Sequence, residues 1–156
     1  PLAMLFRPRA VEFPRDVVVH TCEVLAAKKL GALIAIEGRQ TLRMYEDGAK
    51  PVDAILTTEL LVSIFTPGGP LHDGAVIVRG NRIAAANAFL PLTSTPDPRL
   101  AHGTRHRAAI GLSEESDALV IVISEENGSM SVAADGALRE DVDRAMLTNL
   151  LAERFG

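Results

Sequence analysis

Two adjacent polar residues, His72 and Asp73, lie in a glycine-bounded turn directly before the β-branched run over 74–78. A carboxylate binds hard cations, and Mg²⁺ commonly takes one or two protein carboxylates together with phosphate oxygens. Asp73 is therefore a candidate metal ligand or proton acceptor, although Asp-Gly pairs are also common as simple turn formers. His72 is a weaker metal candidate, because a histidine beside a buried strand also fits a structural role.

A cationic segment, Gly103-Thr104-Arg105-His106-Arg107, occurs where the pattern predicts the first turn of a helix. The free N–H groups and positive dipole end of a helix N-terminus already attract anions, so added cations are unfavourable there unless an external negative charge compensates them. The planar guanidinium of arginine matches phosphate oxygens. The segment thus predicts a site for a di- or triphosphate, with a solvated helix start as the alternative.

A third polar group, Ser124-Glu125-Glu126, follows the wholly apolar run over 118–123. Ligands often bind beyond the ends of buried strands, so these residues are candidate metal or ribose contacts. The alternative interpretation is a polar hairpin corner, because an Asn-Gly pair follows at Asn127.

The rest of the pattern predicts the elements that position these groups. An amphipathic helix is expected over 15–30, with Gly31 as its stop, and wholly apolar strands are expected over 32–36 and 118–123. A hairpin joins strands over 74–78 and 82–89 through a short turn with Gly80. Thr104 is expected to cap a helix that runs to about residue 115.

Further expected elements complete one domain. They are a short strand over 38–45, strands over 52–56 and 129–134, a helix over 59–65 and a C-terminal helix with apolar residues from Val142 to Leu151. The fold class predicted is α/β, a mixed and largely antiparallel central sheet flanked by helices. The prolines of residues 1–14 predict an irregular lead-in before the domain at 15–156.

The composition limits the possible functions. With 156 residues, of which 47% are hydrophobic, the chain is expected to form a single core. A formal net charge of −4 argues against binding of long nucleic acid through counterion release. The single cysteine, Cys22, excludes an internal disulfide framework and a cysteine-based zinc site, and it fits a reducing compartment.

Taken together, the segments 71–75 and 103–107 resemble the Asp-Gly-Ala and Arg-His-Arg signature motifs of the diadenylate cyclase domain family. Similar flanking segments extend the resemblance over about residues 15–138. The resemblance implies a sheet of about seven strands. It also implies a nucleotidyltransferase reaction that condenses two ATP molecules into cyclic di-AMP, a bacterial second messenger, and releases two pyrophosphates.

The resemblance also implies roles for individual residues. Asp73 would bind Mg²⁺ or Mn²⁺ and assist deprotonation of the attacking 3′-hydroxyl, with Glu126 and His72 as further candidate metal ligands. Phe89 and Leu90 would lie by the adenine; family members similar to this one often carry tyrosine at the first of these positions. The other implied substrate contacts are Gly74, Ala75, Gly103, Thr104, Arg105, His106, Arg107, Ser124 and Glu125.

The family resemblance further implies a homodimer in which two subunits, each holding one ATP, meet face to face. The opening segment 4–8 followed by the helix 15–30 is most similar to the membrane-anchored branch of the family. That branch implies a cytoplasmic catalytic domain, an N-terminal membrane anchor absent from this sequence, and a regulatory membrane protein and a phosphosugar mutase as partners. The alternative function is an ATP-binding sensor domain that dimerises without catalysis.

Overall fold

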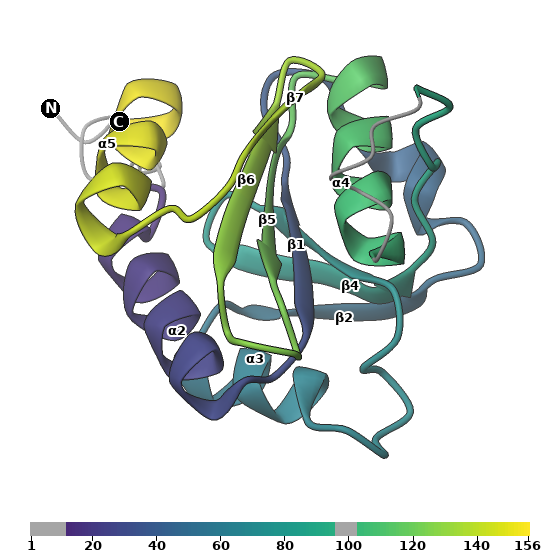
Figure 1. Cartoon of the computed structure of the whole chain (residues 1–156). Helices are drawn as coiled ribbons and strands as arrows, with labels where there is room; N and C mark the ends of the chain where they lie inside the picture. The colour runs from purple at the N-terminus through teal and green to yellow at the C-terminus, as the bar shows by residue number, and fades with distance from the viewer. Residues whose placement is uncertain (1–11, 96–102) are drawn as a thin grey trace, which may run out of the picture.

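The computed structural model describes residues 12–95 and 103–156, so most of the predicted lead-in over 1–14 lies outside the described residues. Seven strands form one mixed sheet, with helices on both of its faces (Figure 1). The elements are α2 (Arg15–Lys28), β1 (Ala32–Ile36), η1 (Arg43–Glu46), β2 (Lys50–Ile55), α3 (Thr58–Phe65), β3 (Ala75–Arg79), β4 (Arg82–Ala88), α4 (Thr104–Glu115), β5 (Leu119–Ile123), β6 (Met130–Ala134), β7 (Ala137–Arg139) and α5 (Arg144–Phe155).

The strand order is β2-β4-β3-β1-β5-β6-β7, and only the β1–β3 pair is parallel. This confirms the predicted α/β fold class with a mixed, largely antiparallel sheet. The two predicted hairpins are confirmed as β3–β4 and β5–β6. The short β7, which follows the turn at 135–136, adds a seventh strand at one edge. Among the described residues, no helix has the length and apolar character needed to cross a membrane.

Two hydrophobic layers sandwich the sheet. One layer joins α2, α3 and α5 to one face, and the other joins α4 to the opposite face. Strands β1 and β5 are buried along their whole length because both of their faces are covered, which explains their continuous apolar sequence. Along β1, Ile34 faces the first layer and Leu33 the second, as the alternation of a strand requires.

Helix α2 ends two residues earlier than predicted. Lys29 adopts the left-handed conformation with φ of 52°, and the N–H groups of Lys29 and Leu30 donate to the carbonyls of Ala26 and Leu25. This arrangement satisfies the last carbonyls of the helix without glycine. The predicted stop at Gly31 is therefore wrong.

The predicted strand over 38–45 is also wrong, because side chains take up the backbone N–H groups of this segment. The carboxylate of Asp117 accepts from the N–H groups of Arg39 and Gln40 at 2.8 and 3.0 Å, and Glu37 accepts from Leu42 at 2.9 Å. With these donors occupied the segment turns, and a 3₁₀ helix follows as η1. Sequence periodicity alone did not reveal these side-chain bonds.

An arginine ties η1 to the sheet. Arg79 Nη2 lies 2.9 Å from Glu37 Oε2 and 3.0 Å from Glu46 Oε2. The hydrogen bonds that Arg79 donates to these two carboxylates hold its pKa above its ordinary value, so the guanidinium stays charged. The network fixes the ends of β1 and β3 on the side where η1 lies.

Candidate active site

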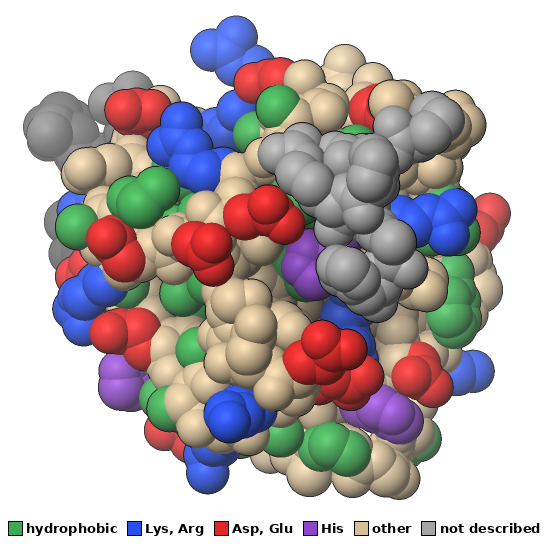
Figure 2. Space-filling view, in the orientation of Figure 1, with side chains coloured by type: hydrophobic (Ala, Val, Ile, Leu, Met, Phe, Trp, Pro, Cys, Tyr) green, Lys and Arg blue, Asp and Glu red, His purple; other side chains and the backbone are tan. Residues whose placement is uncertain are grey.

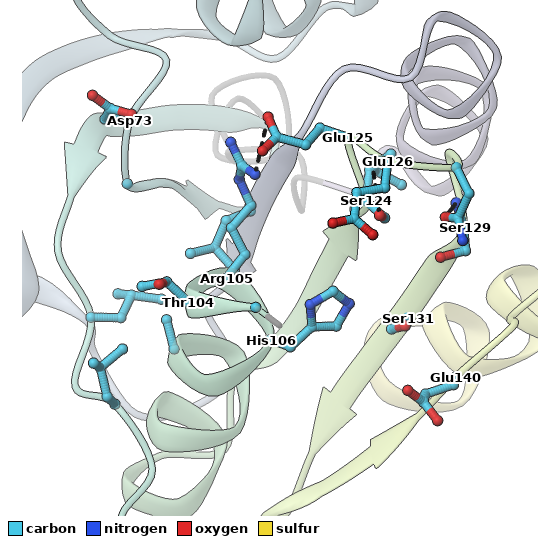
Figure 3. A pocket seen from close by; sticks show the side chains of 18 of the residues that line it. Asp73, Thr104, Arg105, His106, Ser124, Glu125, Glu126, Ser129, Ser131 and Glu140 are labelled. Atoms are coloured by element: carbon cyan, nitrogen blue, oxygen red, sulfur yellow. Dashed lines mark hydrogen bonds and ion pairs between the residues drawn. The ribbon is translucent and has the colours of Figure 1, made fainter. Parts of the chain in front are cut away.

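A pocket of about 670 Å³ lies where the 67–74 turn, the start of α4 and the β5–β6 turn converge (Figure 3). Its volume falls in the range of small-molecule sites. Three separate segments predicted from sequence therefore share one cavity. The predicted residues that line it are Asp73, Gly74, Phe89, Leu90, Gly103, Thr104, Arg105, His106, Ser124, Glu125 and Glu126.

The turn at Asp73 and Gly74, just before β3, is held in place by backbone contacts. Gly74 has φ of 75°, and a Cβ at this position would lie 2.7 Å from the carbonyl oxygen of Ala88, so only glycine allows β3 to start this close to β4. The Asn87 side-chain amide donates to the Asp73 carbonyl at 2.9 Å. The Asp73 side chain itself remains 71% exposed. The backbone of Asp73 is thus held in place, and its carboxylate is open to solvent and ligands.

His72 lies beside this carboxylate. Its Nδ1 is 2.6 Å from the Gly69 carbonyl oxygen, and its Nε2 is 3.4 Å from Asp73 Oδ1. Because a carbonyl oxygen only accepts hydrogen bonds, Nδ1 carries a proton and Nε2 faces the carboxylate. The two side chains therefore place one nitrogen and one oxygen atom that can each ligate a metal next to each other. His72 itself does not line the pocket.

Helix α4 begins without a side-chain cap. Its N-cap is Gly103, and Thr104 is the first helical residue, so the prediction that Thr104 caps the helix is wrong. The first turn also contains no acidic residue. The N–H groups of this turn and the positive end of the helix dipole are left at the pocket wall, where they attract an anion.

Arg105 extends from this helix start into the pocket (Figure 3). Its Nη1 lies 3.7 Å from Glu125 Oε2, and the two side chains are 29% and 68% exposed. A partly exposed pair at this distance contributes little to stability. The Arg105 guanidinium is thus available to a stronger anionic partner such as a phosphate.

Two predicted contacts, Ala75 and Arg107, lie outside the pocket lining. Ala75 is buried in β3 beneath the second hydrophobic layer. The side chain of Arg107 is exposed, and its carbonyl accepts from the Thr93 N–H at 3.0 Å.

Glu126 lies on the far side of the Arg105–Glu125 pair from Asp73 in the view of Figure 3. Its N–H donates to the Ser124 hydroxyl at 3.2 Å, which shapes the β5–β6 turn. Over residues 12–95 and 103–156, no group of three or more histidine, cysteine, aspartate or glutamate side chains is close enough to hold a metal ion. Any cation in this pocket would therefore take part of its ligands from substrate or water.

Sequence reasoning missed several lining residues. Glu140 and Asp141 follow β7, a strand too short to produce a clear pattern, and Ser131 is a buried serine in β6. A serine on the covered face of an apolar strand was the available signal. The other missed lining residues are Leu33, Ala88, Leu92, Ala108, Ile123, Asn127 and Ser129.

The pocket is rich in carboxylates. Among the described lining residues, Arg105 is the one arginine or lysine, facing five acidic side chains: Asp73, Glu125, Glu126, Glu140 and Asp141. A polyphosphate would meet repulsion here unless cations accompany it.

On the face that Figure 2 shows, hydrophobic side chains form small areas separated by charged ones.

Comparison with known proteins gives one consistent family. Residues 19–138 match the family model described as DisA bacterial checkpoint controller nucleotide-binding, or DAC. The chain is 41% identical over 140 residues to the cyclic di-AMP synthase CdaA of Bacillus subtilis, covering 90% of this chain and 51% of the relative. It is 54% identical over 116 residues to the diadenylate cyclase CdaS of Bacillus thuringiensis, covering 73% and 57%. The chain thus spans about half the length of these curated relatives.

Solved structures give the same result. A double mutant of DacA from Staphylococcus aureus superposes with a TM-score of 0.87 at 42% identity, covering 90% of this chain and 94% of that one. A Bacillus cereus protein described as a hypothetical membrane spanning protein superposes with a TM-score of 0.74 at 46% identity, covering 82% and 63%.

Proposed function

The chain belongs to the diadenylate cyclase (DAC) family, and from this premise we propose that it condenses two ATP molecules into cyclic di-AMP with release of two pyrophosphates. The observation that carries the proposal is the sharing of one pocket by the Asp73 carboxylate, the uncapped start of α4 and the Arg105 guanidinium. A group that accepts a proton and groups that bind phosphate thus lie where one nucleotide reaches both.

The triphosphate is bound at the start of α4. The uncapped N–H groups of the first turn and the Thr104 hydroxyl donate to phosphate oxygens, and Arg105 neutralises the charge that grows as pyrophosphate leaves. His106 of α4 and Ser124 of the β5–β6 turn are further lining residues that can donate hydrogen bonds. Arg107 stays a prediction as a phosphate contact, because its side chain does not line the pocket.

The base is bound by an apolar part of the lining. Phe89 is 73% exposed and Leu92 is 46% exposed, whereas Leu90 beside them is buried. A large apolar ring left in water at a pocket mouth is a platform on which a purine can stack. Because phenylalanine has no hydroxyl, it contributes stacking and no side-chain hydrogen bond to the adenine.

The Asp73–His72 pair fits a divalent cation. The carboxylate suits Mg²⁺ or Mn²⁺, the imidazole nitrogen beside it is a further candidate ligand, and phosphate oxygens and water would supply the remaining ligands. When bound, such a cation neutralises phosphate charge and makes a neighbouring hydroxyl more acidic. Glu126 stays a second candidate ligand on the other side of the pocket.

The reaction needs two nucleotides. Asp73 accepts the proton of the 3′-hydroxyl of one ATP while the oxygen of that hydroxyl bonds to the α-phosphorus of the other ATP. The bond from that phosphorus to the β-phosphate oxygen breaks, and pyrophosphate leaves. The same exchange in the opposite direction closes the ring. One pocket of about 670 Å³ suits one ATP, so we place the second ATP on a second copy of the chain, face to face with the first.

The cellular setting is also a proposal. ATP as substrate places this domain in the cytoplasm, and the description of the Bacillus cereus relative as membrane spanning supports attachment of the whole protein to the membrane. A regulatory membrane protein and a phosphosugar mutase stay predicted partners.

The test is to incubate the purified chain with ATP and Mg²⁺ or Mn²⁺, and to identify the product by mass. Cyclic di-AMP and pyrophosphate are expected in a molar ratio of one to two, and a chelator should abolish both while leaving the melting temperature unchanged. ATP binding without any cyclic dinucleotide after hours at high protein concentration would contradict the proposal and indicate the non-catalytic sensor instead.

A further inference from the structure

The Arg105 side chain lies against Gly31, a buried glycine between α2 and β1. A Cβ built on Gly31 would lie 2.5 Å from Arg105 Cζ, 2.5 Å from Nη1 and 2.7 Å from Nη2. Because the central carbon is as near as the two nitrogens, this point lies over the flat face of the guanidinium and not beyond its edge. The guanidinium therefore stacks on the backbone of Gly31.

The backbone gives no other reason for glycine at this position. Gly31 is absent from the positive-φ region, and Lys29 takes the left-handed conformation that ends α2. The three atoms nearest to its missing Cβ all belong to the Arg105 guanidinium. The space that a methyl group would fill is thus occupied by one side chain of the proposed phosphate site.

The register of the sheet explains why these residues meet. Ala32 pairs with Ile123, so Gly31 lies at the end of β1 beside the β5–β6 turn that bears Glu125. Leu33, two residues further on, packs in the layer beneath α4, and strand alternation places Gly31 on that same face. Stacking on this face leaves the N–H groups, which lie in the plane of the guanidinium, directed sideways along the sheet surface, as the 3.7 Å approach of Nη1 to Glu125 illustrates.

We infer that Gly31 is a positioning residue, whose backbone supports the Arg105 guanidinium at the depth where it meets the phosphates. This inference deepens the proposed function and depends on it for the role of Arg105. An alanine at position 31 would require the guanidinium to move by about 1 Å to reach an ordinary contact distance of 3.4 Å. A shift of this size in a group that contacts the substrate can lower a rate by about 100-fold.

The test is a double-mutant cycle of four proteins: the natural chain, Gly31→Ala, Arg105→Ala and the double variant. Gly31→Ala alone should lower ATP affinity and turnover by about 10- to 100-fold. In the Arg105→Ala background the same change should alter neither by more than about twofold, because the displaced group is already gone. Equal losses in both backgrounds would overturn the inference.

Urea unfolding of the same four proteins tests the contact without reference to catalysis. Gly31→Ala should lower the unfolding midpoint of the natural chain only slightly, because the displaced atoms are the far end of a flexible side chain, and it should not lower that of Arg105→Ala. If Gly31→Ala folds only together with Arg105→Ala, the clash is with the guanidinium as inferred. A chain that neither binds nor converts ATP would refute the proposed function, whereas equal midpoint losses in both backgrounds would refute the Gly31–Arg105 contact.

Discussion

At the scale of single residues, the reactive side chains of the pocket are supported by contacts from segments that are distant in the sequence. Asp73 and Glu125 stand out because each is a charged group beside an apolar strand, Arg105 because it is a cation at a helix start, and all three line one pocket. The supports were hidden because they depend on contacts between distant segments. The amide of Asn87 on the Asp73 carbonyl and the fit of Arg105 over Gly31 are examples.

Asp73→Asn should lower turnover by at least about 100-fold, because the amide neither accepts the hydroxyl proton nor binds a cation well. The melting temperature should change little, since the side chain is 71% exposed and the backbone bond from Asn87 remains. Steady-state product formation and a thermal melt measure the two effects. The matched control is Asp53→Asn. Asp53 lies on β2, its carboxylate is 83% exposed and pairs with Arg82 of β4, and the change should leave turnover unchanged. Full activity of Asp73→Asn would remove Asp73 from the chemistry.

At the scale of elements, the strands and the longer helices follow the sequence pattern, and the errors occur at helix ends and in the segment 38–45, where side chains bind backbone groups. Buried strands such as β1 and β5 are predictable because continuous apolar runs have few other uses. The segment 38–45 is not, because its turn depends on Asp117 from the far end of α4. The same region is joined to α4 by the hydrogen bond that the Tyr45 hydroxyl donates to Glu115 at 2.7 Å.

Partial burial, together with the hydrogen bond to Glu115, raises the pKa of Tyr45 to about 12. The unfolded chain releases this proton near pH 10, so the stability from the Tyr45 pair is complete below pH 10 and is lost between about pH 10 and pH 12. Because Tyr45 is the only tyrosine, the ultraviolet absorbance of tyrosinate measures its titration directly.

Glu115→Gln should move this titration of Tyr45 toward pH 10. Tyr45→Phe should remove about 1 kcal/mol or less of the alkaline loss of unfolding free energy, since the pair is partly exposed to solvent. An unshifted titration in Glu115→Gln would show that burial alone raises the pKa. The matched control is Glu114→Gln, the neighbouring carboxylate, which should leave the Tyr45 titration unchanged.

At the scale of the whole molecule, the pocket opens at one side of a sheet whose opposite face is closed by α2, α3 and α5 (Figure 1). The fold class was predictable from the order of elements, whereas the meeting of three segments in one pocket was predicted through the family resemblance and not through local patterns. That meeting depends on the sheet order, in which β1 lies between β3 and β5 and brings the ends of both to the start of α4. Long-range pairing of this kind leaves no local signal in the sequence.

If each subunit holds one ATP, turnover per mole of protein should depend on concentration. At the dilute limit it should rise in proportion to protein concentration and then level off as dimers form, because two bound nucleotides must meet. ATP affinity of the monomer should stay constant over the same range. Parallel sedimentation and product measurements test this. Constant turnover per mole at concentrations where sedimentation finds only monomer would contradict the two-subunit reaction.

The rings of Phe13 and Phe155 lie in contact, with centroids 4.7 Å apart, in the layer that packs against the sheet face opposite α4. The beginning and the end of the described chain therefore lie close together, on the side of the sheet opposite α4. A fluorophore, an affinity handle or a surface linker joined at Gly156 would project away from the nucleotide, so the protein can be immobilised by its tail with the mouth of the cavity still facing the bulk solution.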